Sequence, residues 1–283
     1  MIAASRTFED RIKRIMRRCE ILFLAGFTAV LQLPLALSRA LAADFTAREV
    51  TAQVFQAKAG ERINFSGKDL SNLDLAGLDF KHADLSQANL YGVDLSSANL
   101  SGVNLAGAKL DRAIVIGADF SGANLEGATI LKPSVFSSTK FDYAEAPKFT
   151  GANLRSIRII ARMDGTDFRR ADLTGARIGP FDMSGEAGMA PSTLMMGSDF
   201  SGANLSGVEI RNVNFTFGRF VGTDLRGAKL LNLILAKADF SGADLTGADV
   251  TNSNFDEANL KGAKGLSTLI GAASAKNLPS IIE

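Results

Sequence analysis

Between Ser86 and Leu110 a leucine recurs at every fifth position, and this period is the strongest constraint on the fold. An α-helix turns about 100° per residue, so a step of five residues rotates successive leucines by about 140° and scatters them around the helix. A flat β-strand alternates its faces, so an odd period sends successive leucines to opposite sides. Neither element alone gives these residues a common core.

The other positions of each five-residue unit show how the leucines can share a core. The residue two before each leucine is usually small, the residue between them is mostly Asp or Asn, and Gly recurs two residues after the leucine. Over three extended residues, the small residue and the leucine point to one side and the Asp or Asn to the other. Glycine then permits a sharp corner. Four such corners close a square coil of about 20 residues whose leucines face one axis.

Two long runs follow this period without a gap. The fifth position is apolar in 14 consecutive units from Phe65 to Ile130 and in 13 units from Phe200 to Leu260. The coil length has independent support, because Phe200, Phe220 and Phe240 lie 20 residues apart. The sequence therefore predicts a solenoid in which these phenylalanines stack on one face of successive coils.

These units resemble the pentapeptide-repeat family, whose consensus is A-(D/N)-L-x-x. SGANL stands at 121–125 and again at 201–205, TGANL at 150–154 and SGADL at 241–245. The resemblance covers roughly residues 65–262 with interruptions. It implies an all-β fold, a right-handed quadrilateral β-helix, and it implies no catalytic residue.

The period also predicts how the chain is organised around the solenoid. Thr46 and Glu49 form a capping-box pattern, and Val50 and Val54 share a face, so a short helix is expected before the first repeat. Such a helix would cover the unpaired strand edges of the first coil. We therefore expect four segments, which are a signal peptide over 1–42, an N-terminal capping helix within 43–64, the β-solenoid over 65–262 and a C-terminal cap or tail over 263–283.

The register breaks twice, near 131–148 and near 184–197. Phe136 and Phe141 keep one five-residue step in the first break, and Met183 closes a run that is one residue out of phase. We expect loops or distorted corners between two regular stacks on one axis, and two solenoids joined by a linker are the alternative. Gap filling is favoured over copper(I) ligation for the methionines near the breaks, which are Met163, Met183, Met189, Met195 and Met196.

Residues 1–42 have the three parts of a secretory signal peptide. Residues 1–20 hold six Lys or Arg, residues 21–37 are apolar and uncharged, and Ala40 and Ala42 form an A-x-A cleavage pattern. We therefore predict cleavage after Ala42 and an exported protein, located in the periplasm or in a thylakoid lumen. An inner-membrane anchor formed by uncleaved residues 21–37 is the alternative, and it would be the only contact with a membrane.

The exported chain has a modest charge and few catalytic side chains. The whole chain of 283 residues has a formal net charge of +1. Removing seven basic and three acidic residues with 1–42 leaves 24 Lys and Arg against 27 Asp and Glu, a net charge of −3. This balance gives no reason to expect nucleic-acid binding. Cys19 leaves with the signal peptide, and the one histidine, His82, is interpreted as a solvated surface residue, so no enzyme, metal site or cofactor is predicted.

One segment departs from the acidic character of the repeats. Lys148–Pro180 carries seven Lys or Arg against three Asp, whereas Phe65–Ile130 carries four Lys or Arg against eight Asp or Glu. The spacing predicts that Arg158 and Arg177 lie on one face of adjacent coils. Six arginines form a candidate patch for an acidic partner, and a solvated face paired with local aspartates is the alternative. These arginines are Arg155, Arg158, Arg162, Arg169, Arg170 and Arg177.

The sequence therefore predicts a non-enzymatic, exported β-solenoid that acts as a rigid protein-interaction or structural scaffold. Its protein partner is expected to be acidic, and the ends of the rod allow end-to-end self-association. The alternative is a cytosolic solenoid that mimics DNA and binds a topoisomerase, as the resemblance implies for the quinolone-resistance members of the family. This alternative requires that residues 1–42 do not export the chain.

Overall fold

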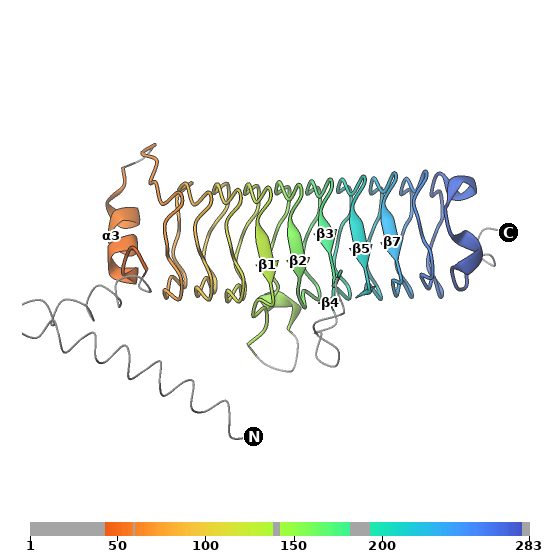
Figure 1. Ribbon diagram of the computed structural model, residues 1–283, viewed down its shortest axis with the longest axis horizontal. Coiled ribbons are helices and arrows are strands. Elements are labelled where there is room, and N and C mark those ends of the chain that lie inside the picture. Colours follow the sequence, from red (N-terminus) through yellow and green to blue (C-terminus); the bar gives the residue numbers. More distant parts are fainter. Residues whose placement is uncertain (1–42, 59, 138–141, 182–192, 279–283) are drawn as a thin grey trace, which may run out of the picture. The chain divides into compact units, whose positions relative to one another are not determined.

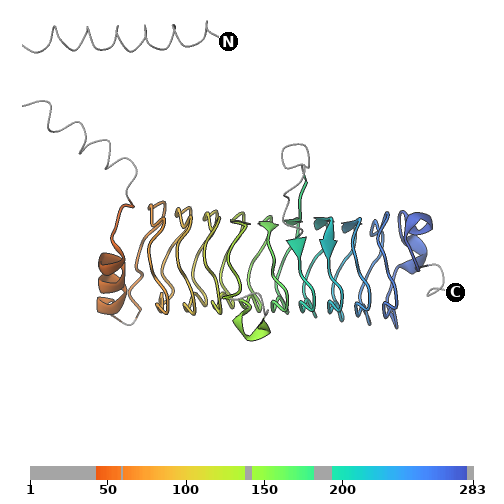
Figure 2. The same cartoon turned by 90° about the horizontal axis from the view of Figure 1, so that it is seen from below.

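The computed structural model describes residues 43–58, 60–137, 142–181 and 193–278. The chain divides into two compact units, Met1–Ala42 and Ala43–Glu283. The second unit winds as a stack of coils that follow one another in sequence order from α3 to the C-terminal end (Figures 1 and 2). Each coil therefore packs mainly on the coils just before and after it, as in other solenoids.

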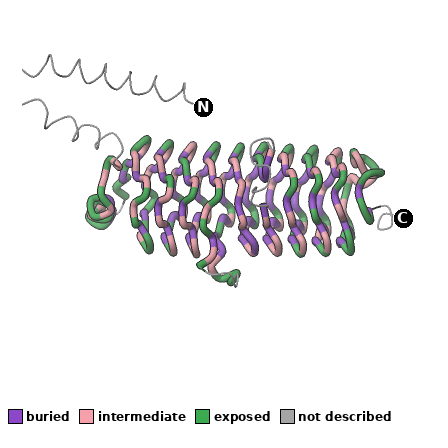
Figure 3. The backbone as a smooth tube through the Cα atoms, turned by 60° about the horizontal axis from the view of Figure 1, so that its bottom comes forward, coloured by how far each residue is buried: buried purple, intermediate pink, exposed green. Residues whose placement is uncertain are grey.

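Each wall of a coil is three residues long, and Ala98, Asn99 and Leu100 show its construction. Ala98 and Leu100 are fully buried, and Asn99 between them is exposed. The Leu100 amide donates to the Asp119 carbonyl (2.8 Å) and the Asn99 amide to the Leu78 carbonyl (2.9 Å), so the wall bonds to both neighbouring coils. The alternation of buried and exposed positions continues along the stack (Figure 3). The predicted five-residue geometry is confirmed.

The corners are tight turns with a left-handed residue in third position. After Leu100, the Val103 amide donates to the Leu100 carbonyl (3.1 Å), and Gly102 between them has a φ of 67°. A type II turn requires a positive φ at this position, and glycine adopts it without steric cost. The Gly102 amide also donates to the Ser121 carbonyl (3.0 Å), so each corner is bonded to the corner of the next coil as well.

Most walls pair through single parallel bridges between residues 20 apart, such as Asn99 with Asp119. One side of the stack has longer contacts and forms a parallel sheet in the order β1-β2-β3-β5-β7. Its strands are β1 (Thr129–Leu131), β2 (Arg158–Ile160), β3 (Arg177–Ile178), β5 (Glu209–Arg211) and β7 (Lys229–Leu231). On another wall, β4 (Thr193–Leu194) pairs with β6 (Val213–Asn214).

The stack is continuous across both breaks in the repeat. Asp119 pairs with Lys148 beyond the first break, and Asp167 pairs with Asp199 beyond the second. A column of stacked phenylalanine rings follows the same path, with neighbouring ring centroids 4.7–5.2 Å apart. The column consists of Phe120, Phe149, Phe168, Phe200, Phe220 and Phe240. The two regular runs thus share one core.

The first break begins later than the sequence suggests. Ser134 still bridges to Ile114, and Val135 is only 3% exposed, so Val135 occupies the fifth position. The expectation for Phe136 is wrong by one residue, because Val135 follows Ile130 by five residues and keeps the period, and Phe136 is only partly buried. The 3₁₀-helix η1 (Tyr143–Glu145) precedes the return to the stack at Lys148.

Methionine fills the core where the repeat is irregular. Met163 follows Ile159 by four residues instead of five, and it is fully buried, as is Met195. Arg162 bridges to Leu194, so the two methionines occupy the same wall of neighbouring coils. An unbranched side chain adapts to such an irregular space. Phe141, Met183 and Met189 lie outside the described residues.

The two ends of the stack are closed in different ways. The helix α3 (Ala47–Gln56) packs Val50 and Val54 into the core of the first coil. Thr46 and Glu49 form the expected capping box, in which the Thr46 amide donates to the Glu49 carboxylate (2.7 Å). The capping helix is therefore confirmed. The other end carries the short 3₁₀-helices η2 (Leu266–Thr268) and η3 (Ala272–Ser274).

Candidate interaction surface

The outward aspartates of the walls are engaged in the repeat itself. The Asp84 carboxylate accepts hydrogen bonds from the Ser86 amide (2.9 Å) and from the Asn104 side chain of the next coil (3.0 Å). Hydrogen bonding from Ser86 is the main cause that holds the pKa of Asp84 below its usual value. Hydrogen bonding from Arg226 does the same for the pKa of Asp224. Such carboxylates stay ionised and stabilise corners, and a general acid needs the opposite shift.

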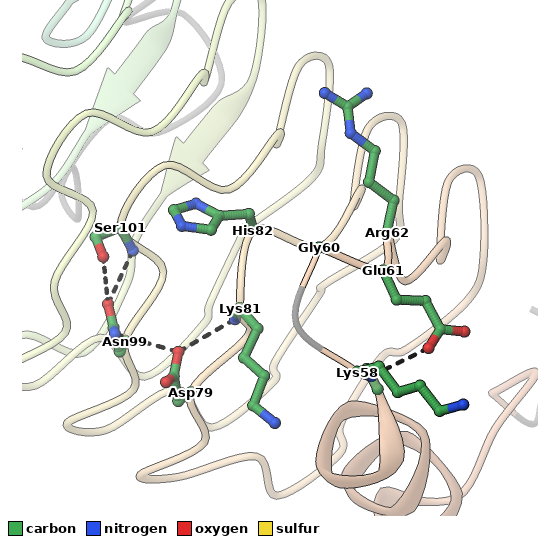
Figure 4. A pocket seen from close by; sticks show the side chains of 10 residues that line it. Lys58, Gly60, Glu61, Arg62, Asp79, Lys81, His82, Asn99 and Ser101 are labelled. Atoms are coloured by element: carbon green, nitrogen blue, oxygen red, sulfur yellow. Dashed lines mark hydrogen bonds between the residues drawn. The ribbon is translucent and has the colours of Figure 1, made fainter.

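His82 lies at a cleft between the end of α3 and the first coils (Figure 4). In that view the His82 ring points away from Asp79, which accepts from the Lys81 amide (3.1 Å) and the Asn99 side chain (3.2 Å). The ring instead covers Gly102 of the next coil, where an added Cβ would lie 2.6 Å from His82 Nδ1. His82 and Asp79 are therefore not paired with each other in this cleft. Across the described ranges, no group of three His, Cys, Asp or Glu residues is arranged to hold a metal ion.

The structure distributes the six predicted arginines around the coil. Arg155 lies at one corner, Arg169 and Arg170 lie at another, and Arg162 is on a wall of its own. Arg158 and Arg177 lie together, because β2 and β3 pair with these two residues in register. The structure therefore brings two of the six together and separates the other four.

Three of the separated arginines have local carboxylate partners, as the solvated-face alternative predicts. The pairs are Arg155 with Asp172 (3.3 Å), Arg162 with Asp164 (2.8 Å) and Arg169 with Asp167 (2.6 Å). Arg170 lies beside the corner of the next coil, with its Cγ 3.7 Å from the point where Gly202 would carry a Cβ. The pairs of Arg155 and Arg169 are exposed ion pairs, which contribute little to stability. Arg162 instead contacts a buried carboxylate, because Asp164 is only 2% exposed and also accepts from the Met196 amide (2.8 Å).

Arg158 and Arg177 instead belong to a cluster around an aromatic ring. Their guanidinium carbons lie 4.6 Å and 4.2 Å from the centroid of the Phe181 ring. Arg211, at the end of β5, lies 5.6 Å from the same centroid. Cations at such distances are attracted by the face of the ring. We call Arg158, Arg177, Arg211 and Phe181 the arginine cluster.

The cluster is fixed to the backbone at Arg158. The Arg158 Nη1 donates to the carbonyl of Gly179 (2.7 Å), which follows β3 directly. Burial, followed by the charge of Arg177, lowers the pKa of Arg158 from its ordinary value. Glu209 supplies the carboxylate of the group, since Arg211 Nε donates to it (2.7 Å) and Arg177 Nε lies 3.8 Å away. Three cations therefore face one carboxylate among the described residues.

Two members of the cluster, Arg211 and Phe181, were not predicted from the sequence. Ile178 pairs with Ile210, so Arg211 comes from the coil after the second break. The length of that break conceals which later repeat becomes the neighbour of Arg177. The sequence does contain a signal for Phe181. This aromatic residue follows Arg177 by four residues and does not occupy a fifth position, so the repeat core does not account for it.

Comparison with known proteins decides the family. A family model described as pentapeptide repeats matches the chain in eight copies, over residues 61–90, 88–127, 194–232 and 234–264. The chain belongs to the pentapeptide-repeat family. The right-handed quadrilateral β-helix that the resemblance implies is therefore confirmed as its fold. No protein of curated function matches this pentapeptide-repeat protein.

Several solved pentapeptide-repeat structures are similar to this pentapeptide-repeat protein. HetL of the cyanobacterium Nostoc, described as involved in heterocyst differentiation regulation, is 24% identical, with 77% of this chain and 92% of HetL covered and a TM-score of 0.38. Full-length QnrB1, a plasmid-mediated fluoroquinolone resistance protein, is 19% identical, with 62% and 88% covered and a TM-score of 0.39. A protein from the Arabidopsis thaliana thylakoid lumen is 28% identical, with 45% and 76% covered and a TM-score of 0.25.

Proposed function

We propose that this pentapeptide-repeat protein is a non-enzymatic, exported scaffold that binds an acidic protein partner through the outer surface of its solenoid. The observation that carries the proposal is the unbroken stack, which holds charged side chains of distant repeats in fixed register on one rigid wall. Fixed side chains lose less conformational entropy on binding than mobile ones. The outward carboxylates, by contrast, are occupied by the corners, which supports a binding role over a catalytic one.

Export is supported by the agreement of two observations. The boundary between the two compact units falls between Ala42 and Ala43, and this is where the A-x-A pattern predicts cleavage. Among the described residues, no helix has the length and apolar character needed to span a membrane. Cleavage after Ala42 would release the solenoid together with its capping helix α3.

The charge pattern favours this scaffold over a cytosolic DNA mimic. The phenylalanines of the column and the residues just before them belong to one wall of the solenoid. The outward residues of this wall are Asp79, Asn99, Asp119, Lys148, Asp167, Asp199, Arg219, Asp239 and Asn259. Lys148 and Arg219 interrupt its acidic row, and the sheet β1-β2-β3-β5-β7 on the opposite wall carries the arginine cluster. A surface that imitates the uniform negative charge of a duplex would exclude such cations.

Two measurements test the proposal. The intact mass of the protein from the native cell should correspond to a chain that begins at Ala43, recovered from the envelope or lumen fraction. The 43–283 protein, immobilised, should capture an acidic protein from that fraction, and added salt should weaken the capture because screening reduces the attraction. Full-length protein in the cytosol would contradict export, and failure of the wild-type protein to capture any partner would contradict the scaffold.

A further inference from the structure

The arginine cluster has more positive charge than its own residues neutralise. Arg158, Arg177 and Arg211 contribute three positive charges, and Glu209 is the carboxylate that contacts them among the described residues. Glu209 bonds closely to Arg211 and only distantly to Arg177, and Arg158 donates to backbone carbonyls. We propose that this cluster is a carboxylate-binding site that takes a helical acidic segment of the partner, an inference that rests on the proposed scaffold function.

The site is held ready before any ligand arrives. Arg158 Nη1 lies 2.7 Å from the Gly179 carbonyl and 3.4 Å from the Arg177 carbonyl, so its guanidinium group is fixed over β3. The Phe181 ring holds the Arg177 and Arg158 groups at 4.2 Å and 4.6 Å. Like charges in register on neighbouring strands repel each other modestly, and the ring and the carbonyls offset this repulsion. The two guanidinium groups therefore remain adjacent on one wall.

Glu209 demonstrates which chemistry the cluster accepts. Its carboxylate receives a hydrogen bond from Arg211 Nε at 2.7 Å and lies 3.8 Å from Arg177 Nε. Planar guanidinium groups match the two oxygens of a carboxylate, and such charge-assisted bonds are stronger than neutral ones. A carboxylate supplied by a partner would accept hydrogen bonds from Arg158 and Arg177, as the Glu209 carboxylate accepts one from Arg211.

The spacing of the strands selects a helical segment. Neighbouring strands of a sheet lie about 4.8 Å apart. Residues i and i+4 of an α-helix are separated by a rise of about 6.0 Å, and their Cβ atoms lie about 5–6 Å apart. Carboxylates at positions i and i+4 of a helix that runs along the stack therefore meet Arg158 and Arg177 with a small mismatch that long side chains absorb. In an extended segment, residues on the same side lie about 6.6–6.8 Å apart, which is a poorer match to the same pair.

Peptide binding to the protein as purified from its native host tests the site. The probe is a fluorescent helix-forming peptide with Glu at i and i+4, and the reference peptide has the same composition with Glu at i and i+2. Arg158→Gln with Arg177→Gln should weaken binding of the first peptide at least about fivefold, as expected for the loss of charge-assisted bonds. Glu209→Gln should strengthen binding, because it removes the internal competitor.

A matched control separates the site from overall charge. Arg219 and Arg226 are exposed and paired with Asp199 and Asp224 away from the cluster, so Arg219→Gln with Arg226→Gln makes the same change in net charge. This control should bind the peptide nearly as the wild type does. Equal weakening by both double variants, equal affinity for the two peptides, or competition by inorganic phosphate or anionic vesicles in preference to the peptide would overturn the proposal.

Folding and the wider function are tested separately. If the double variant at Arg158 and Arg177 loses its native melting transition, the opposite effect of Glu209→Gln still decides the question, since unchanged or weaker binding in that variant contradicts the site. If the folded double variant captures the envelope partner as the wild type does, the carboxylate site is wrong while the scaffold function stands. If the wild-type protein captures nothing, the scaffold function itself fails.

Discussion

Leu100 and Asn99 are adjacent in the chain and lie on opposite sides of the wall, with Leu100 fully buried and Asn99 exposed. Leu100→Ala should reduce the free energy of unfolding by about 2–5 kcal/mol, because it leaves a cavity in the centre of a coil. Asn99→Ser should cost less than about 1 kcal/mol, since the exposed side chain loses its hydrogen bond to Asp79 while a serine hydroxyl can still accept from the Ser101 amide, as Asn99 does. Urea unfolding monitored by circular dichroism measures both values, and equal effects at the two positions would contradict the inward and outward assignment.

The outward aspartates make the stability of the fold depend on pH. The pKa values of Asp84, Asp224 and Asp239 are lowered in the folded chain, chiefly by hydrogen bonds from Ser86, Arg226 and Ser241. In the unfolded chain an aspartate has a pKa of about 3.9. The stabilisation is therefore fully present above about pH 4 and is lost as the pH falls through the lower folded values. Urea midpoints should stay level from about pH 7 to 5 and decrease below about pH 4, and a midpoint that rises on acidification would contradict this assignment.

The phenylalanine column is the element that joins the two regular runs. Phe168 stacks on Phe149 at 5.2 Å and on Phe200 at 4.7 Å, with interplanar angles of 6°. Phe168→Ala should cost about 3–5 kcal/mol, whereas Phe168→Leu should cost less than about 1.5 kcal/mol, because Leu100 already occupies this column. Hydrogen exchange should show that the alanine variant opens the coils on both sides of Phe168. An effect confined to one side would mean that the column does not carry packing across the breaks.

The limits of prediction from the sequence also lie at the scale of elements. The five-residue period predicted the walls and the corners, because each position in the unit has one geometric role, and the capping-box pattern of Thr46 and Glu49 predicted the capping helix. The register of Arg158 with Arg177 was predictable because one deleted residue separates the repeats in between. Arg211 was not, because the long second break hides the next coil. Val135 was predictable as well, since it follows Ile130 by five residues, and the expectation for Phe136 missed this step.

At the scale of the whole molecule, the account depends on a single stack that continues through both breaks. Bridges across the breaks join Asp119 to Lys148 and Asp167 to Asp199, and without them Arg177 and Arg211 would not share a wall. The stack therefore determines the candidate site as well as the shape of the solenoid. A repeat protein of this kind transmits packing only between neighbouring coils, so one missing contact would divide it into two independent parts.

Disulfide formation across the second break tests this claim most directly. In a chain with Cys19→Ser, the pair Asp167→Cys and Asp199→Cys lies on neighbouring strands, about 4.8 Å apart, within the Cα separation that a disulfide spans. The pair Asn99→Cys and Asp119→Cys, also on neighbouring strands but inside the first regular run, is the reference. Under mild oxidation, both pairs should form intramolecular disulfides at similar rates, as measured by mass spectrometry. Closure of the reference pair without closure of the Asp167→Cys and Asp199→Cys pair would contradict a continuous solenoid.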